Sequence, residues 1–411
     1  MLHRSSWVGL IALGAILNLA VGALGPLPST LDTGEVLEAR SAQWTDATGV
    51  QHQDVTGDDV SVYTTEGVNQ HPDLEACLDK GNHGYASIAG QNPSTPVGDA
   101  QSSHGTLTAG VLCGDGTLSR GSDLQQPVTG VAPGMRLFSF GGICVDSDCA
   151  PWFEHHDIRI VSHSMTGDPT VKAEDRGASP DADILFVMSA GNGGGDGSSA
   201  ETIFPYDEER VMGVANGYAD GSDIFKLSSR GAKDDPSTWP HITAPGCTYT
   251  PGLHPEATVS DHGPLRALLN VPPVGSESGE CANIDLIPAL AHRAHGYHLA
   301  SGTSMAAPYV SGVAAMMFEV HPGLTALEAK HLLTRTAEPF LPVPGNAEPS
   351  PEEFHEEHGY KAGYGLVNAT GAVAAAHYMA LEPGADASEA VDAYHVGYAL
   401  DGALVLNPNA G

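Results

Sequence analysis

Positive charge is scarce in this sequence. Its 411 residues include 17 Lys and Arg against 50 Asp and Glu, which gives a formal net charge of −33. A surface of this sign repels nucleic acids and anionic membranes, so we exclude both as partners. Acid-rich loops suit structural calcium, but none has a recognisable ligand spacing, and we assign no metal ligands. The simpler interpretation is an acidic, solvated surface.

Long apolar runs are absent after residue 23, so the rest of the chain offers no candidate for a membrane span. Residues 1–23 have a short basic start, an apolar stretch from Trp7 to Val21, and small residues at 21–23. This order is typical of a signal peptide. We therefore expect a secreted monomer, extracellular or periplasmic.

Cysteines are few, but their number is even, which favours disulfides in an exported chain. Cys144 and Cys149 would close one tight loop, and Cys247 and Cys281 would bracket a longer one. That assignment leaves Cys77 to pair with Cys113. Many other pairings remain open, because spacing alone does not fix disulfide connectivity.

Internal repeats are absent too, and the expected elements alternate between strands and helices. The run Asp181–Ala190 is almost continuously apolar, which is typical of a buried parallel strand. The alternation predicts an α/β sandwich on a mostly parallel sheet. We expect loops over 245–299 and 340–360. The other strands are expected at 60–65, 136–140, 158–162, 210–214 and 241–244, and helices at 104–112, 303–319 and 325–336.

The segment from Ser301 to Pro308, SGTSMAAP, carries the strongest chemical signal. A serine at the start of a helix exposes its hydroxyl, and the backbone N–H groups around it face any oxyanion that forms there. The alternative is an ordinary serine cap, and a serine cap alone would indicate little. The whole eight-residue segment is far more specific, and it makes Ser304 our candidate nucleophile.

These eight residues resemble the nucleophile motif of the subtilisin-like serine peptidases, GTSMAxP. Residues 104–110, HGTLTAG, are similar to the family's histidine motif, and residues 189–192, SAGN, to its oxyanion segment. The resemblance implies that His104 is the general base and that Asn192 donates to the oxyanion. Weaker matches lie at 130–133, 162–167, 243–246 and 363–368.

The resemblance covers about residues 55–375 and implies the subtilisin-like three-layer sandwich with a mostly parallel central sheet. We place a signal peptide at 1–23 and an N-terminal arm at 24–55. The peptidase domain then spans 56–375, with a long loop insertion at 245–299. An acidic tail follows at 376–411.

The family's triad aspartate is missing. In the family it ends a strand shortly before the motif HPDL, which is present here at 71–74. Depending on the direction of alignment, either Thr65 or Glu66 takes its place. Glu66 is the candidate acid, because its longer side chain can compensate for a shorter backbone and Glu serves in some serine hydrolases. The sequence equally allows an alternative, in which Glu66 is a solvent-facing residue in a degenerate turn.

The resemblance implies an exported serine endopeptidase that acts on extended polypeptides and needs no cofactor for its chemistry. The missing aspartate favours an alternative, a non-catalytic protein that binds peptide or a protein partner in the same cleft. The intact His104, Asn192 and Ser304 oppose it. Esterase or peptide ligase activity through the same acyl-enzyme is a third reading.

Overall fold

The computed structural model describes ten stretches of the chain, and some of the sequence predictions lie outside them. These include the signal peptide, almost all of the N-terminal arm, the pairing of Cys144 with Cys149, the partner of Cys247, and Gly167. The described stretches are residues 55–69, 71–84, 103–117, 129–140, 150–165, 183–202, 209–218, 223–251, 297–346 and 349–395.

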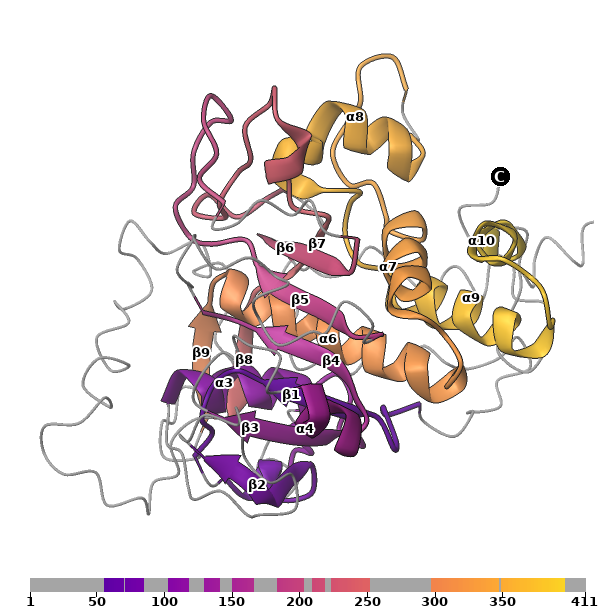
Figure 1. Cartoon of the computed structure of the whole chain (residues 1–411). Coiled ribbons are helices and arrows are strands. Elements are labelled where there is room, and N and C mark those ends of the chain that lie inside the picture. Colours follow the sequence, from indigo (N-terminus) through magenta and orange to yellow (C-terminus); the bar gives the residue numbers. More distant parts are fainter. Residues whose placement is uncertain are drawn as a thin grey trace, which may run out of the picture.

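A seven-stranded sheet forms the centre of the molecule, and all its strand pairs are parallel (Figure 1). Its order is β2-β3-β1-β4-β5-β6-β7, so the chain starts inside the sheet and builds outward in both directions. The predicted α/β fold is confirmed. The strands are β1 (Ser61–Thr64), β2 (Leu78–Gly84), β3 (Arg136–Phe140), β4 (Ile158–His163), β5 (Leu185–Ser189), β6 (Val211–Gly217) and β7 (Ile242–Pro245).

Helices cover both faces of this sheet and the side where its strands begin. None of the helices in the described stretches combines the length and apolar character needed to cross a bilayer. They are α3 (Ser103–Cys113), α4 (Ala150–His155), α6 (Thr303–Val320), α7 (Ala326–Arg335), α8 (Pro351–Ala362), α9 (Ala369–Leu381) and α10 (Ala387–His395), with the short 3-10 helices η1 (Pro72–Leu74) and η5 (Pro236–Thr238).

The two faces of the sheet carry different side chains because successive strand residues point to opposite sides. Val62 and Leu137 face the main core, to which α3 and α6 also contribute. Tyr63 and Phe138, the next residues along, face the opposite way and meet Trp152 of α4 at ring-centroid distances of 6.2 and 5.4 Å. The sheet is therefore the middle of three layers.

Helix α6 is buried along most of its length. Its alanines and glycine let the sheet and α3 approach closely. At its far end, the Glu319 carboxylate accepts hydrogen bonds from the backbone N–H groups of Thr56, Gly57 and Asp58, at 2.9, 2.6 and 3.2 Å. The chain entering β1 is thus fixed to the helix that carries Ser304.

Two segments predicted as loops contain regular structure. The predicted loop 245–299 begins and ends in an antiparallel pair, β8 (Cys247–Pro251) and β9 (Tyr297–Ser301). The β-forming residues Thr248, Tyr249 and Thr250 explain β8. This pair leads the chain directly into the N-terminus of α6.

The prediction of a loop over 340–360 is wrong, because α8 begins at Pro351. Ser350 and Glu353 form a reciprocal capping box, in which each side chain accepts from the other residue's backbone N–H. Pro351 fits the first helical position, and Phe354 is fully buried. The high acid content of this segment concealed a helix start.

The described residues after 375 also pack into the fold. Helix α9 runs on to Leu381, and α10 follows it. In α10, Ala390 and Val391 belong to the main core. Figure 1 shows α7, α9 and α10 together on one side of the molecule. The acidic composition of residues 376–395 therefore describes the exposed faces of packed helices.

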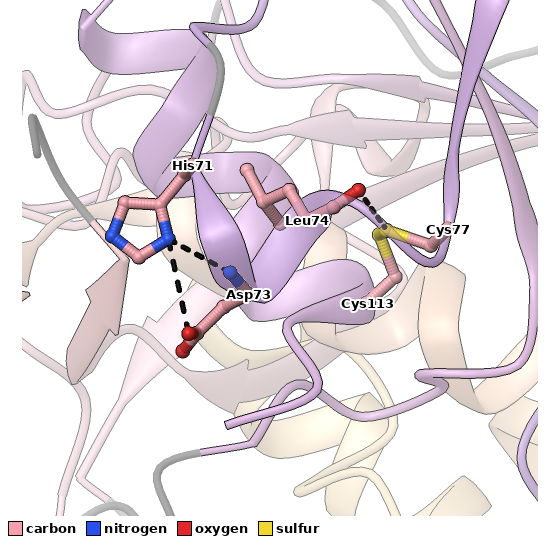
Figure 2. Close-up of a disulfide and its surroundings, with 5 residues drawn as sticks. All are labelled: His71, Asp73, Leu74, Cys77 and Cys113. Carbon is pink, nitrogen blue, oxygen red and sulfur yellow. Dashed lines mark hydrogen bonds and ion pairs between the residues drawn. A yellow bond between two sulfur atoms is a disulfide. The ribbon is translucent and has the colours of Figure 1, made fainter. Parts of the chain in front are cut away.

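Figure 2 shows a disulfide between Cys77 and Cys113, the pairing that the sequence left over. It joins the last residue of α3 to the residue before β2, and both cysteines are buried. Nearby, the Asp73 backbone N–H donates to His71 Nδ1 at 3.2 Å. The disulfide therefore fixes the C-terminal end of the helix whose second residue is His104.

We expect the double variant Cys77→Ala/Cys113→Ala to lose about 2–4 kcal/mol of unfolding free energy. The disulfide closes a chain segment with a sequence separation of 36, and its loss frees the unfolded chain. Denaturant unfolding of the two proteins, both under non-reducing conditions, measures the difference. Equal midpoints and slopes would show that packing alone holds this end of α3.

Candidate active site

The carboxyl ends of parallel strands meet at one edge of a sheet, and the candidate residues gather there. Glu66 follows β1, Ser164 follows β4, and Asn192 follows β5. Helix α3 brings His104, and α6 brings Ser304, to the same edge through their first turns. Gly167, the last residue of the weaker family match at 162–167, lies outside the described residues.

Glu66 and His104 contact each other directly. His104 Nδ1 lies 2.5 Å from Glu66 Oε1. The Glu66 side chain is 2% exposed and that of His104 43%. The interpretation of Glu66 as a solvent-facing residue is therefore wrong. Thr65, the other candidate position, points elsewhere: its hydroxyl bonds to His163 Nδ1 at 2.8 Å.

Gly105 permits this contact. A Cβ added to Gly105 would stand 2.1 Å from the Gly67 carbonyl oxygen and 2.8 Å from Glu66 Cβ. No side chain fits in that space, so only glycine lets the first turn of α3 rest on the end of β1. From the other side, the Ser139 hydroxyl donates to the Glu66 carbonyl oxygen at 2.8 Å.

The pKa of His104 is raised above its usual value by two effects of Glu66 that outweigh burial. Burial alone would lower the pKa, because it disfavours the charged imidazolium. The hydrogen bond that Glu66 accepts from His104 Nδ1 and the negative charge of the Glu66 carboxylate both raise the pKa. The pair therefore holds the imidazole with Nδ1 toward Glu66, which leaves Nε2 directed away from the acid.

Ser304 lies in the first turn of α6, one residue after Thr303. The turn begins at Gly302, whose φ of 142° is a conformation that L side chains rarely adopt. The Ser304 hydroxyl donates to the Ser164 carbonyl oxygen at 2.9 Å. Within the described stretches, no hydrogen bond joins Ser304 to His104. Catalytic hydrogen bonds are often completed only when substrate binds.

Asn192 is held against the same turn. Its Oδ1 accepts from the backbone N–H of Thr303 at 3.0 Å and from the Thr303 hydroxyl at 3.2 Å. Because Oδ1 is engaged as an acceptor, the amide Nδ2 is the end of the side chain that can donate to a ligand. Asn192 is exposed to solvent at the carboxyl edge of the sheet.

The structure thus joins Glu66 to His104 and Asn192 to the turn that carries Ser304. Among the residues it describes, no cluster of three or more His, Cys, Asp or Glu side chains could hold a metal ion. At this edge lie a paired imidazole, a hydroxyl at a helix N-terminus and an amide donor, from His104, Ser304 and Asn192. Acyl transfer uses groups of these three kinds.

Comparison with known proteins gives the same family that the motifs suggest. The model of the subtilase family matches residues 57–371. Serine protease AprX of Bacillus subtilis is 28% identical over 308 residues, which are 68% of this chain and 62% of AprX. Mycosin-3 of Mycobacterium tuberculosis is 29% identical over 261 residues, 60% of this chain and 46% of mycosin-3. Each match thus spans less than two thirds of the relative's length.

A solved protease structure from Pseudoalteromonas arctica PAMC 21717 has the same fold. It superposes with a TM-score of 0.51 at 20% identity, covering 83% of this chain and 94% of that one. At this identity the likeness concerns the fold, and the roles of individual residues rest on the geometry above.

We expect Gly105→Ala to separate His104 from Glu66. The added methyl group would meet the Gly67 carbonyl oxygen, so the first turn of α3 must move outward. Overpacking of this kind costs about 1–3 kcal/mol. Thermal unfolding and the NMR titration of His104 check both effects. The control is Gly323→Ala, whose new Cβ would meet its nearest neighbour, the His321 ring, at 3.3 Å. Equal melting temperatures and equal His104 titrations in the two variants would contradict the prediction.

In an NMR titration, we expect His104 to have a pKa above the usual histidine value, and Glu66→Gln to lower it. The substitution removes the charge and leaves the effect of burial. A raised folded-state pKa means that the pair stabilises the fold most at low pH. The stability difference between wild type and Glu66→Gln should therefore shrink as pH rises through the folded-state pKa of His104. An unchanged His104 titration in the variant would refute the coupling.

Proposed function

Because the chain belongs to the subtilase family, we propose that it is a secreted serine endopeptidase that cleaves extended polypeptides through an acyl-enzyme on Ser304. The observation that carries this proposal is the hydrogen bond between the buried Glu66 carboxylate and His104. It supports Glu66 as the acid of the triad in place of the family's aspartate. Secretion rests on the sequence pattern of residues 1–23.

In the proposed reaction, Ser304 Oγ attacks the carbonyl carbon of the scissile bond while His104 Nε2 takes its proton. Glu66 keeps the imidazole in the tautomer that protonates Nδ1 and stabilises the imidazolium that forms. His104 then gives the proton to the leaving amine. Water, deprotonated by the same imidazole, hydrolyses the ester and restores Ser304.

The negative oxygen of the tetrahedral intermediate would lie near the N-terminus of α6. Asn192 Nδ2 is the side-chain donor there, because Thr303 already occupies Oδ1. The helix dipole adds positive potential at the same point. In subtilisin, loss of the asparagine donor lowers turnover by about 10²–10³-fold, and we assign Asn192 the same role.

One contact must change before the reaction starts. The Ser304 hydroxyl donates to the Ser164 carbonyl, and it must turn to donate to His104 Nε2. The sequence over 162–167 resembles the segment along which subtilase substrates bind as an extended strand. Substrate N–H groups that bond the Ser164 carbonyl would release the hydroxyl for catalysis.

The energetics of Glu66 oppose a non-catalytic role for this edge. A buried carboxylate destabilises a fold unless it is well paired, and replacing such a pair by apolar residues is often neutral or stabilising. A protein that only bound peptides would gain nothing from this pair.

For the same chain we infer one domain that extends to α10, because Ala390 and Val391 lie in its core.

Fluorophosphonate labelling tests the proposal. We expect the purified wild-type protein to label covalently and Ser304→Ala to remain unlabelled. Glu66→Gln should label far more slowly, since removal of the triad acid lowers turnover about 3 × 10⁴-fold in subtilisin. Glu382→Gln changes an exposed carboxylate at the C-terminal end of α9, outside the candidate site, and this matched control should label like wild type.

If wild type and Ser304→Ala both fail to label although circular dichroism shows both folded, the peptidase proposal is wrong. A peptide-binding protein then becomes the better description. Labelling by wild type, followed by mass spectrometry of cleaved casein, would separate endopeptidase from esterase activity.

A further inference from the structure

The Glu66 carboxylate has a second partner besides His104. Thr108 Oγ1 lies 3.3 Å from Glu66 Oε2, while His104 takes Oε1. We propose that Thr108 is a positioning residue, which fixes the second oxygen of Glu66 so that the first is held toward His104. This inference rests on the proposed function, and it names the residue that adapts the site to a glutamate.

The two partners of the carboxylate come from one rigid element. Thr108 follows His104 by four residues in α3, so the two side chains lie on the same face of the helix, one turn apart. Together they meet both oxygens of a single carboxylate. A carboxylate bound at one oxygen can swing about that contact, whereas one bound at both is fixed in orientation.

Burial makes the second hydrogen bond important. Thr108 is 1% exposed and Glu66 3% exposed, so water has little access to Oε2. Within the described stretches, His104 and Thr108 are the side chains that hydrogen-bond to this carboxylate. Hydrogen bonds to charged groups contribute more than neutral ones, and an unsatisfied buried oxygen destabilises the ionised form.

The longer acid explains why such a partner is needed. Glutamate has one more rotatable bond than aspartate between the backbone and the carboxylate. Its backbone is already fixed through Ser139 at 2.8 Å, and that bond restrains no side-chain torsion. The contact to Thr108 restrains the extra torsion from the far end of the side chain.

The Thr108 hydroxyl also has a second acceptor in its own helix. It lies 3.0 Å from the Gly105 carbonyl oxygen, and one hydroxyl proton is shared between that oxygen and Glu66. Both acceptors lie toward the first turn of α3. The hydroxyl is thus confined to the region between Gly105 and Glu66 in either case.

The test compares Thr108→Val, which keeps the shape and removes the hydroxyl, with Thr108→Ser, which keeps the hydroxyl. Thr334→Val is the matched control, because Thr334 is a buried threonine of α7 whose hydroxyl bonds only to carbonyls of its own helix. Each substitution is made in wild type and in Glu66→Ala. The rate of fluorophosphonate labelling and the melting temperature are measured for every protein.

We expect Thr108→Val to slow labelling about tenfold in wild type, as the loss of one hydrogen bond to a charged group predicts. In the Glu66→Ala background the same change should slow labelling less than twofold, because the carboxylate it acts on is gone. Thr108→Ser and Thr334→Val should label like wild type. If Thr108→Val does not fold, Thr108→Ala makes the same comparison.

A second readout does not depend on activity. The His104 Nδ1 proton should give a low-field NMR signal in wild type and Thr108→Ser that broadens by exchange in Thr108→Val. If wild type does not label at all, the peptidase proposal fails, and this signal still decides the role of Thr108. An unchanged signal in Thr108→Val, or an equal slowing with and without Glu66, would overturn the inference.

Discussion

The close approach of α3 to the end of β1 is the constraint on which the site depends. It requires Gly105, since a Cβ there would overlap the Gly67 carbonyl oxygen. It brings Glu66 within 2.5 Å of His104, and it places Thr108 beside the other carboxylate oxygen. The disulfide at Cys113 fixes the opposite end of the same helix. A small outward shift of α3 would break these contacts together. The geometry of the site therefore depends on the packing of Gly105 against the Gly67 carbonyl oxygen.

Ser304 reaches the edge by an independent route. Its helix is tied to the sheet through the core, and to the chain entering β1 through Glu319. Its first turn is held by Asn192, which follows β5. His104 and Ser304, the proposed base and nucleophile, therefore belong to separate helices that share one core. Their relative position is set by packing along α3 and α6, and the hydrogen bond of Ser304 to the Ser164 carbonyl is a local contact that the proposed reaction must exchange.

Much of this could be predicted from the sequence, because the decisive signals are local. The small-residue helix at Thr303, the apolar run before Ser189 and the motifs around His104 and Asn192 are each contained in a few consecutive residues. The choice between Thr65 and Glu66 was not local. It depends on which of two adjacent side chains, pointing to opposite sides, meets a helix 38 residues away. The helix α8 is hard to predict for another reason: its acidic composition is typical of a loop, although Ser350 and Glu353 form a helix cap.

Thr108 shows how a residue inside a short motif can contact a distant part of the chain. In the sequence it lies in the segment HGTLTAG at 104–110, and nothing there links it to the end of a strand about 40 residues earlier. The structure gives the link, because a helix turn places it over the carboxylate that His104 already binds. In the proposed triad, a glutamate in place of the aspartate adds length and one torsion angle to the acid. Orientation of the imidazole then depends on a contact that restrains that torsion, and the Thr108 hydroxyl, from the same helix as His104, provides this contact without moving the backbone. The proposed role of Glu66 and the inferred role of Thr108 therefore stand together as two parts of one arrangement.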